Sequence, residues 1–266
     1  MTFSLHRGES ALLVSMPHIG TGIPAELQAD YQPRALAVED TDWHLDRLYD
    51  FLPALGASVL QPRTSRYVID LNRPPDDAPM YPGASNTELC PTRFFTGDDL
   101  YLPGRSPPPD ERQRRRDIYW RPYHEALVAE LQRIKAVHGY ALLWDAHSIR
   151  SRIPWLFEGT LPTLNLGTAN GASADPSIAR ELQQVCQAAP KFSHVLNGRF
   201  KGGYITRHYG SPKDHVHAVQ LEMCQVAYME EDSPFAYDET KAREIQPLLQ
   251  LMMTRAVSAC QALYEN

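Results

Sequence analysis

Apolar residues are arranged along this chain in two alternating patterns. A continuous apolar run of strand length occurs at residues 11–17, and residues 57–63, 66–72, 140–145 and 218–225 are also interpreted as strands. Runs of this kind are typical of strands that are buried on both faces. Helical spacing of the apolar positions occurs instead at residues 41–56, 109–139, 175–189 and 239–263. Because strands and helices alternate, the pattern predicts an α/β layered fold with a largely parallel sheet.

Start and stop signals mark the predicted helices. Asp110 is placed to cap the helix over residues 109–139 and Gly139 to end it, while Pro122 is expected to kink it. The arginine cluster that runs from residue 112 to residue 116 is interpreted as a solvated helix face rather than a phosphate site. The preceding stretch, residues 73–109, is rich in Pro, Gly and Asp and is predicted to be a long ordered loop, a type that is often functional.

Composition and charge argue against several classes of protein. Apolar residues make up 43% of the chain and charged residues 22%, which is ordinary for a globular protein. The net charge of -6 gives no support for nucleic-acid binding, which usually needs a basic face. No uncharged apolar run approaches the length of a membrane span, and the N-terminus lacks the apolar stretch of a signal peptide. We therefore expect a single cytoplasmic domain over residues 1–266.

Polar side chains gather where the predicted strands end, and open α/β sheets bind ligands at the carboxyl ends of their strands. The residues at these ends are His18, Asp70, Asn72, Arg73, Asp145, His147, Ser148 and Glu222, and the stretch DTDWHLD adds Asp40, Asp42 and His44. Histidines and carboxylates at one sheet edge form the ligand set of a catalytic zinc, which takes three protein ligands and keeps a position for water.

The same residues also admit structural roles. A lone histidine is more often structural, Asp70 fits a turn cap, and Asp145 fits a partner that orients His147. Glu222 differs, because an acid in an apolar strand is costly to bury without a partner. The spacing includes no compact ligand motif such as HExxH, so the residues alone favour a metal hydrolase without deciding it.

Long and unusual stretches between residues 13 and 231 narrow the choice. They are SMPHIGTGIP, DTDWHLDRLYDF, SRYVIDLNRP, IYWRPYHEAL, LLWDAHSIRS, LNLGTANG, NGRFKGGYITRHYG and AVQLEMCQVAYMEE. In these stretches the chain closely resembles the N-formylglutamate amidohydrolases of histidine degradation, a family similar to zinc carboxypeptidases and aspartoacylase. The resemblance implies a three-layer sandwich in which a mixed, mostly parallel sheet lies between helices.

The resemblance also implies a metal site and a general base. His18 and His147 match the metal histidines of the family, and Glu222 matches the general base of the wider superfamily. One position departs from the aspartoacylase-like pattern, which has a glutamate ligand three residues after the first histidine. Thr21 stands there in this chain, so Asp42 is expected as the remaining ligand. The alternatives for this third ligand are Asp40 and His44.

Five residues are expected to bind the substrate. The DLNR signature implies that Asn72 and Arg73 contact a substrate carboxylate, with Arg66 as a second candidate. In the stretch RFKGGYITRHYG, Arg207 is expected to hold the second carboxylate of a glutamate. Arg150, in the stretch HSIRS, is expected to add a positive charge to the wall of the pocket. A planar guanidinium suits this task because it binds a carboxylate through two hydrogen bonds.

The resemblance implies metal-dependent hydrolysis of N-formyl-L-glutamate to formate and L-glutamate. One divalent metal ion is expected, with zinc favoured, although iron, cobalt or manganese suit similar ligands. The expected partner is a small N-formyl amino acid with two carboxylates, without nucleic acid or membrane, and the chain is expected to be a monomer or a small homo-oligomer. Two alternatives stay open: an aspartoacylase-like N-acyl amino-acid deacylase, and a non-catalytic protein that binds an acidic ligand on the same scaffold.

Overall fold

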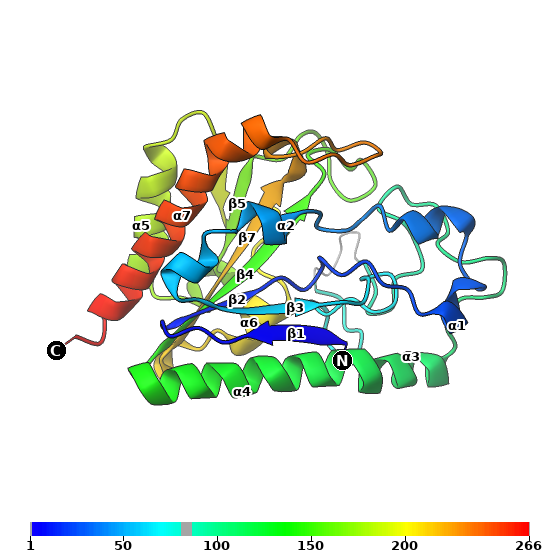
Figure 1. The fold of residues 1–266 in the computed structure, drawn as a ribbon, viewed down its shortest axis with the longest axis horizontal. Helices are drawn as coiled ribbons and strands as arrows, with labels where there is room; N and C mark the ends of the chain where they lie inside the picture. The colour runs from blue at the N-terminus through cyan, green and yellow to red at the C-terminus, as the bar shows by residue number, and fades with distance from the viewer. Residues whose placement is uncertain (1, 81–86, 266) are drawn as a thin grey trace.

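The computed structural model describes residues 2–80 and 87–265. Its strands form one mixed sheet in the order β1-β3-β2-β4-β7-β5-β6 (Figure 1). Their bounds are β1 Phe3–His6, β2 Leu12–Ser15, β3 Ser58–Pro62, β4 Ala141–Ile149, β5 Leu164–Gly167, β6 His194–Leu196 and β7 Val216–Cys224. The pairs β2–β3, β2–β4, β4–β7 and β5–β6 are parallel, and the pairs β1–β3 and β5–β7 are antiparallel. The predicted mixed, mostly parallel sheet is confirmed.

Helices cover both faces of this sheet, which gives the predicted three layers. In Figure 1, α4 and α6 lie on one side of the sheet and α5 and α7 on the other. The α-helices are α1 Ala25–Gln28, α2 Leu45–Leu48, α3 Pro109–Arg115, α4 Arg121–His138, α5 Pro176–Gln187, α6 Tyr204–Tyr209 and α7 Glu239–Ala262. Short 3₁₀ turns are η1 Pro33–Ala37, η2 Leu52–Leu55, η4 Ala169–Gly171, η5 Pro212–Asp214 and η6 Gln225–Ala227. Within the described part of the chain, none of these helices has both the length and the apolar character needed to cross a membrane.

The central strands account for the continuous apolar runs. Every residue of β2 and β4 is buried, because helices cover both faces and neighbouring strands cover both edges. The predicted strands at residues 11–17, 57–63, 140–145 and 218–225 correspond to β2, β3, β4 and β7. Sequence patterns did not predict β1, β5 and β6, which are only three or four residues long and lie toward the two sides of the sheet.

The predicted strand at residues 66–72 is wrong. This segment is buried, as its apolar residues require, but it forms turns. Its backbone groups bond to side chains and loops instead of to a neighbouring strand: the carbonyl of Val68 accepts from Arg115, and the amide of Asp70 donates to the carbonyl of Leu89. The apolar pattern of residues 66–72 therefore belongs to a buried loop rather than to a strand.

The predicted helix at residues 41–56 is also wrong in extent. Only α2 and η2 are helical there, and Pro53 is the second residue of the 3₁₀ turn. Before α2 the chain is irregular, and His44 adopts a left-handed conformation with φ of 60°. The irregular start lets Asp42 turn inward, and its amide donates to the carbonyl of His18 at 3.1 Å.

The predicted helix at residues 109–139 is confirmed with two changes. A π-helical turn, η3 (Arg116–Trp120), joins α3 to α4 just before Pro122, and Gly139 ends α4 with φ of 81°. Asp110 lies in the first turn rather than at the cap, because Pro108 occupies the capping position. The arginine cluster is not wholly solvated, since Arg115 is 1% exposed and bonds to Tyr101 and Val68. The preceding predicted loop includes residues 81–86, which lie outside the described residues.

Candidate metal and active site

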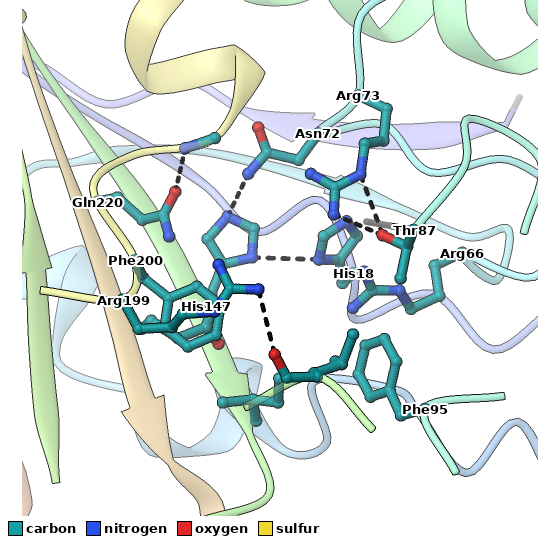
Figure 2. Close-up of a pocket in the computed structure, with 14 residues that line it drawn as sticks. His18, Arg66, Asn72, Arg73, Thr87, Phe95, His147, Arg199, Phe200 and Gln220 are labelled. Atoms are coloured by element: carbon teal, nitrogen blue, oxygen red, sulfur yellow. Dashed lines mark hydrogen bonds between the residues drawn. The ribbon is translucent and has the colours of Figure 1, made fainter. Parts of the chain in front are cut away.

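A pocket of about 590 Å³ opens at the carboxyl ends of β2, β4 and β7 (Figure 2). It is lined by His18, Arg66, Asn72, Arg73, Thr87, Phe95, His147, Ile149, Leu156, Arg199, Phe200, Gly203, Gln220 and Glu222. The lining mixes cationic, aromatic and hydrogen-bonding groups, as the sites of small polar ligands do. The predicted edge of the sheet therefore carries a small-molecule pocket.

Three buried side chains meet at the base of this pocket. His147 Nδ1 lies 3.1 Å from His18 Nδ1 and 3.2 Å from Asp42 Oδ2, and His18 Nδ1 lies 3.6 Å from the same Asp42 oxygen. Donor atoms bound tetrahedrally to zinc at ordinary bond lengths are roughly 3.4 Å apart. The three predicted metal ligands are thus brought together at the spacing that a metal ion requires.

Each histidine of this triad faces a second acid through its other ring nitrogen. His18 Nε2 lies 2.6 Å from Asp70 Oδ1, and His147 Nε2 lies 3.0 Å from Asp145 Oδ1. The hydrogen bond to Asp70 favours a proton on His18 Nε2 and leaves the lone pair of His18 Nδ1 free for a metal ion, whereas Asp145 contacts His147 through charge. The carboxylates and histidines fit a metal ion well, and the interpretation of Asp145 as an orienting partner agrees with this geometry.

The charges of the triad depend on one another. Burial alone would raise the pKa of Asp42, but His18 and His147 hold it below its ordinary value. Burial alone would lower the pKa of His147, but Asp145 and Asp42 hold it well above its ordinary value. Because carboxylates outnumber the two histidines, the cluster is negatively charged and favours a cation. A metal ion would replace the proton that these acids otherwise stabilise on His147.

Glu222 lies beside the triad on the neighbouring strand. It pairs with His147 across the parallel ladder between β4 and β7, so both side chains reach the same part of the pocket. The side chain is buried, and the residue is 8% exposed. Burial raises the pKa of Glu222 to about 8, and the nearby charge of His147 opposes this rise. A buried acid with a raised pKa next to a candidate metal site has the character of a proton-transfer group.

Two predicted arginines line the pocket near His18. Arg66 donates to Asp70 at 2.8 Å, lies 3.6 Å from Asp42, and stacks over the ring of Phe95 at 4.7 Å. Arg73 donates to Thr87 at 3.0 Å and is 4.0 Å from Asp70. Arg66 therefore stabilises the acids around the candidate metal site, while Arg73 lies beside Thr87 (Figure 2).

Asn72 also lines the pocket, but its amide is bonded within the protein. Its Oδ1 accepts from the amide of Ile205 at 2.8 Å. Its Nδ2 lies 2.8 Å from His147 Nε2 and 3.2 Å from Asp145 Oδ2. Asn72 is thus held against the His147 ring by contacts within the protein, and its role in binding substrate stays a prediction.

Other predicted residues lie outside this cluster. The alternative ligand Asp40 accepts from the Tyr67 hydroxyl, and His44 Nε2 lies 2.7 Å from the Phe235 carbonyl, so neither belongs to the triad. Arg150 lies 3.6 Å from Glu39 and faces a neighbouring hollow. Arg207 is exposed on α6, and its Nε donates to the Gly202 carbonyl. Neither arginine is among the residues that line the pocket.

The pocket also contains groups that sequence reasoning did not predict. They include Arg199, Phe200, Gln220, Phe95 and Thr87. Gln220 could have been predicted from the sequence. It stands two residues before Glu222 on β7, so its side chain points to the same face of the sheet. Its Oε1 accepts from the amide of Gly203 at 2.6 Å. Arg199 is in a loop, where periodicity gives no signal.

Two residues of the long helix hold the segment that carries Asn72 and Arg73. Trp120, in the π-helical turn, donates from Nε1 to the carbonyl of Arg73 at 3.0 Å. His124, one turn later, contacts the carbonyl of Leu71 through Nε2 at 2.9 Å. Burial lowers the pKa of His124 to about 3, so the neutral ring donates from Nε2. The carbonyls on both sides of Asn72 are thereby fixed from the helix.

Comparison with known proteins identifies the family. The family model for N-formylglutamate amidohydrolase matches residues 10–229. The chain is 53% identical over 250 residues to an N-formylglutamate deformylase of Pseudomonas putida, which covers 94% of this chain and 93% of that protein. It is 56% identical over 234 residues to an N-formylglutamate deformylase of Pseudomonas aeruginosa, with 88% of each chain covered.

The chain belongs to the N-formylglutamate amidohydrolase family. Solved structures agree with this family's fold: an N-formylglutamate amidohydrolase from Ralstonia eutropha JMP134 matches with a TM-score of 0.81 at 24% identity, over 96% of this chain and 97% of that chain. A protein from Agrobacterium tumefaciens matches with a TM-score of 0.72 at 19% identity, over 97% and 95%. The resemblance found in the sequence motifs is confirmed, and the motifs that carried it supply both histidines, Asp42 and Glu222.

Proposed function

We propose that this protein hydrolyses N-formyl-L-glutamate to formate and L-glutamate, with one divalent metal ion as cofactor. The observation that carries the proposal is the position of Glu222 beside the His18–Asp42–His147 triad, in a chain of the N-formylglutamate amidohydrolase family. The names of its Pseudomonas relatives support the same substrate. The family resemblance implies that this reaction is the last step of histidine degradation.

The triad is proposed to hold the metal, with zinc favoured by two imidazoles and one carboxylate. When bound there, the ion supplies a lowered pKa for a water molecule and polarisation of the formyl carbonyl. Asp70 keeps His18 in the tautomer that binds, and the charge of Asp145 makes His147 a stronger ligand. Arg66 neutralises the acids around them, which keeps the buried cluster from carrying excess negative charge.

Substrate orientation is proposed to come from Arg73. Its guanidinium lies in the pocket wall near the metal site and binds the carboxylate next to the formamide nitrogen through paired hydrogen bonds. This contact directs the formamide carbonyl toward the triad. Correct orientation alone contributes about 7 kcal/mol or more to lowering a reaction barrier.

Glu222 is proposed to move the proton. It accepts a proton from the attacking water, since its carboxyl group lines the pocket beside the triad. The water oxygen forms a bond to the formyl carbon, and Glu222 then donates the proton to the departing nitrogen as the carbon–nitrogen bond breaks. Formate and the free amino group of L-glutamate result, and Glu222 returns to its starting state.

Formate release by the purified protein tests this function. Wild-type protein is expected to release formate from N-formyl-L-glutamate, to lose that activity after chelation, and to regain it when zinc is added. N-acetyl- and N-succinyl-L-glutamate are the matched substrates that test an aspartoacylase-like acyl preference. Release of acetate or succinate without formate, or no release at all by folded and metal-loaded protein, would contradict the proposal.

A further inference from the structure

Arg199 occupies a part of the pocket that the sequence motifs left without a role. It stands in the loop between β6 and α6 and lines the pocket together with Phe200 and Leu156. In Figure 2, Arg199 lies on the His147 side of the pocket, whereas Arg66 and Arg73 lie on the His18 side. Guanidinium groups therefore line the pocket on two sides.

The loop that carries Arg199 is fixed at both ends. On one side of Arg199, the amide of Asn197 donates to the Leu166 carbonyl at 2.7 Å. On the other side, the carbonyl of Lys201 accepts from Ala169 at 2.6 Å, and the amide of Gly203 donates to Gln220. The arginine is therefore presented from an anchored loop, which lowers the entropic cost of binding a ligand.

Contacts around the side chain set the direction of the guanidinium. Its Nη2 lies 3.4 Å from the Leu156 carbonyl, and the group lies 5.5 Å from the ring centroid of Phe200. Leu156, Phe200 and Ile149 also line the pocket, so apolar surface lies next to the cation. A cation beside an apolar wall suits a ligand in which methylene groups end in a carboxylate.

We propose that Arg199 binds the side-chain carboxylate of the substrate and selects N-formyl amino acids with an acidic side chain. This inference rests on the proposed function. With the first carboxylate at Arg73 and the formamide at the triad, the substrate side chain extends toward the opposite wall, where Arg199 lies. Its two methylenes pack on Leu156 and Phe200, and its carboxylate meets the guanidinium. Arg199 thus takes the role that the sequence motifs had given to Arg207.

Paired substrates test the proposal. N-formyl-L-glutamine has nearly the shape of N-formyl-L-glutamate but carries no charge on its side chain. Arg199→Gln is expected to lower kcat/KM for N-formyl-L-glutamate about 10- to 100-fold, the effect of losing a charge-assisted hydrogen bond. Its kcat/KM for N-formyl-L-glutamine should change less than about 3-fold, so the preference for the acid collapses. Arg199→Lys, which keeps the charge without the planar fork, should recover part of the preference.

Two further variants act as controls. Lys201→Gln removes the same charge from the same loop and should leave the preference unchanged, because Lys201 is not among the residues that line the pocket. Arg207→Gln tests the expectation from the motifs. Collapse of the preference in Arg207→Gln or Lys201→Gln, with Arg199→Gln behaving as wild type, would overturn the assignment of Arg199. If wild-type protein releases formate from neither substrate, the proposed function itself fails, which is a different result.

Discussion

Single residues of this site act in pairs. Each triad histidine faces an acid across its ring, and at His18 the hydrogen bond to Asp70 decides which nitrogen is available to a metal ion. Strand patterns and family motifs both pointed to His18, His147 and Glu222, whereas Asp42 came from the family motif, with Asp40 and His44 as alternatives. It could not predict the role of Arg199, since no periodicity or motif spacing indicates where a loop directs its side chain. For the same reason, Arg207 was predicted to bind the substrate although it lies outside the pocket.

The role of Glu222 can be separated from that of a metal ligand. Glu222→Gln keeps the size of the side chain and removes its ability to accept a proton. Turnover is expected to fall by about 100-fold or more, the usual contribution of a general base, while metal content stays at the wild-type level. Elemental analysis alongside the formate assay checks this. Metal content that falls in step with activity would instead identify Glu222 as a ligand.

Among the elements, the long helix supports the site from outside the pocket. Its π-helical turn displaces the helix register just before Pro122, and Trp120 and His124 then donate to the carbonyls on either side of Asn72. π-helical turns are frequent at functional sites. The sequence predicted this helix and a kink at Pro122, but it did not predict the π-helical turn. The buried loop at residues 66–72 was mistaken for a strand because both carry the same apolar pattern.

Removal of the Trp120 donor tests the support that the helix gives. Trp120→Phe keeps an aromatic ring on His124 and removes the hydrogen bond to the Arg73 carbonyl. We expect kcat/KM to fall about 3- to 10-fold, mainly through a higher KM, because Arg73 loses its fixed position. Tyr119→Phe, which removes a hydroxyl from the same turn, is the control and should retain wild-type kinetics. Equal effects of both changes would mean that the turn acts through general stability alone.

In the molecule as a whole, the candidate metal site joins three separate parts of the chain. His18 follows β2, Asp42 precedes α2, and His147 lies on β4 at the centre of the sheet. The family comparison confirms the fold class that alternating patterns predicted, and the sheet order places these parts together. The sequence could not supply that order, because strand pairing depends on contacts between distant residues.

Metal binding should therefore stabilise the whole molecule. At a metal concentration about 100 times the Kd, binding adds about 2.7 kcal/mol to the free energy of unfolding. For a chain of this size we expect chelation to lower Tm by roughly 5 to 10 °C, as thermal unfolding monitored by circular dichroism would measure. Glu222→Gln should keep this difference and His18→Asn should lose it. A Tm that does not respond to chelation and metal addition would argue against the site.

The pocket is built from two kinds of scaffold. The position of Glu222 relative to His147 is set by a ladder of nine residue pairs between β4 and β7, whereas Arg199 and Phe200 come from a connecting loop. Mutations in a loop can accumulate without altering the hydrogen bonds of a central sheet. If Arg199 selects the substrate as proposed, varying residues 197–203 would change which acylated amino acid is accepted and leave the pairing of His147 with Glu222 on the central strands intact.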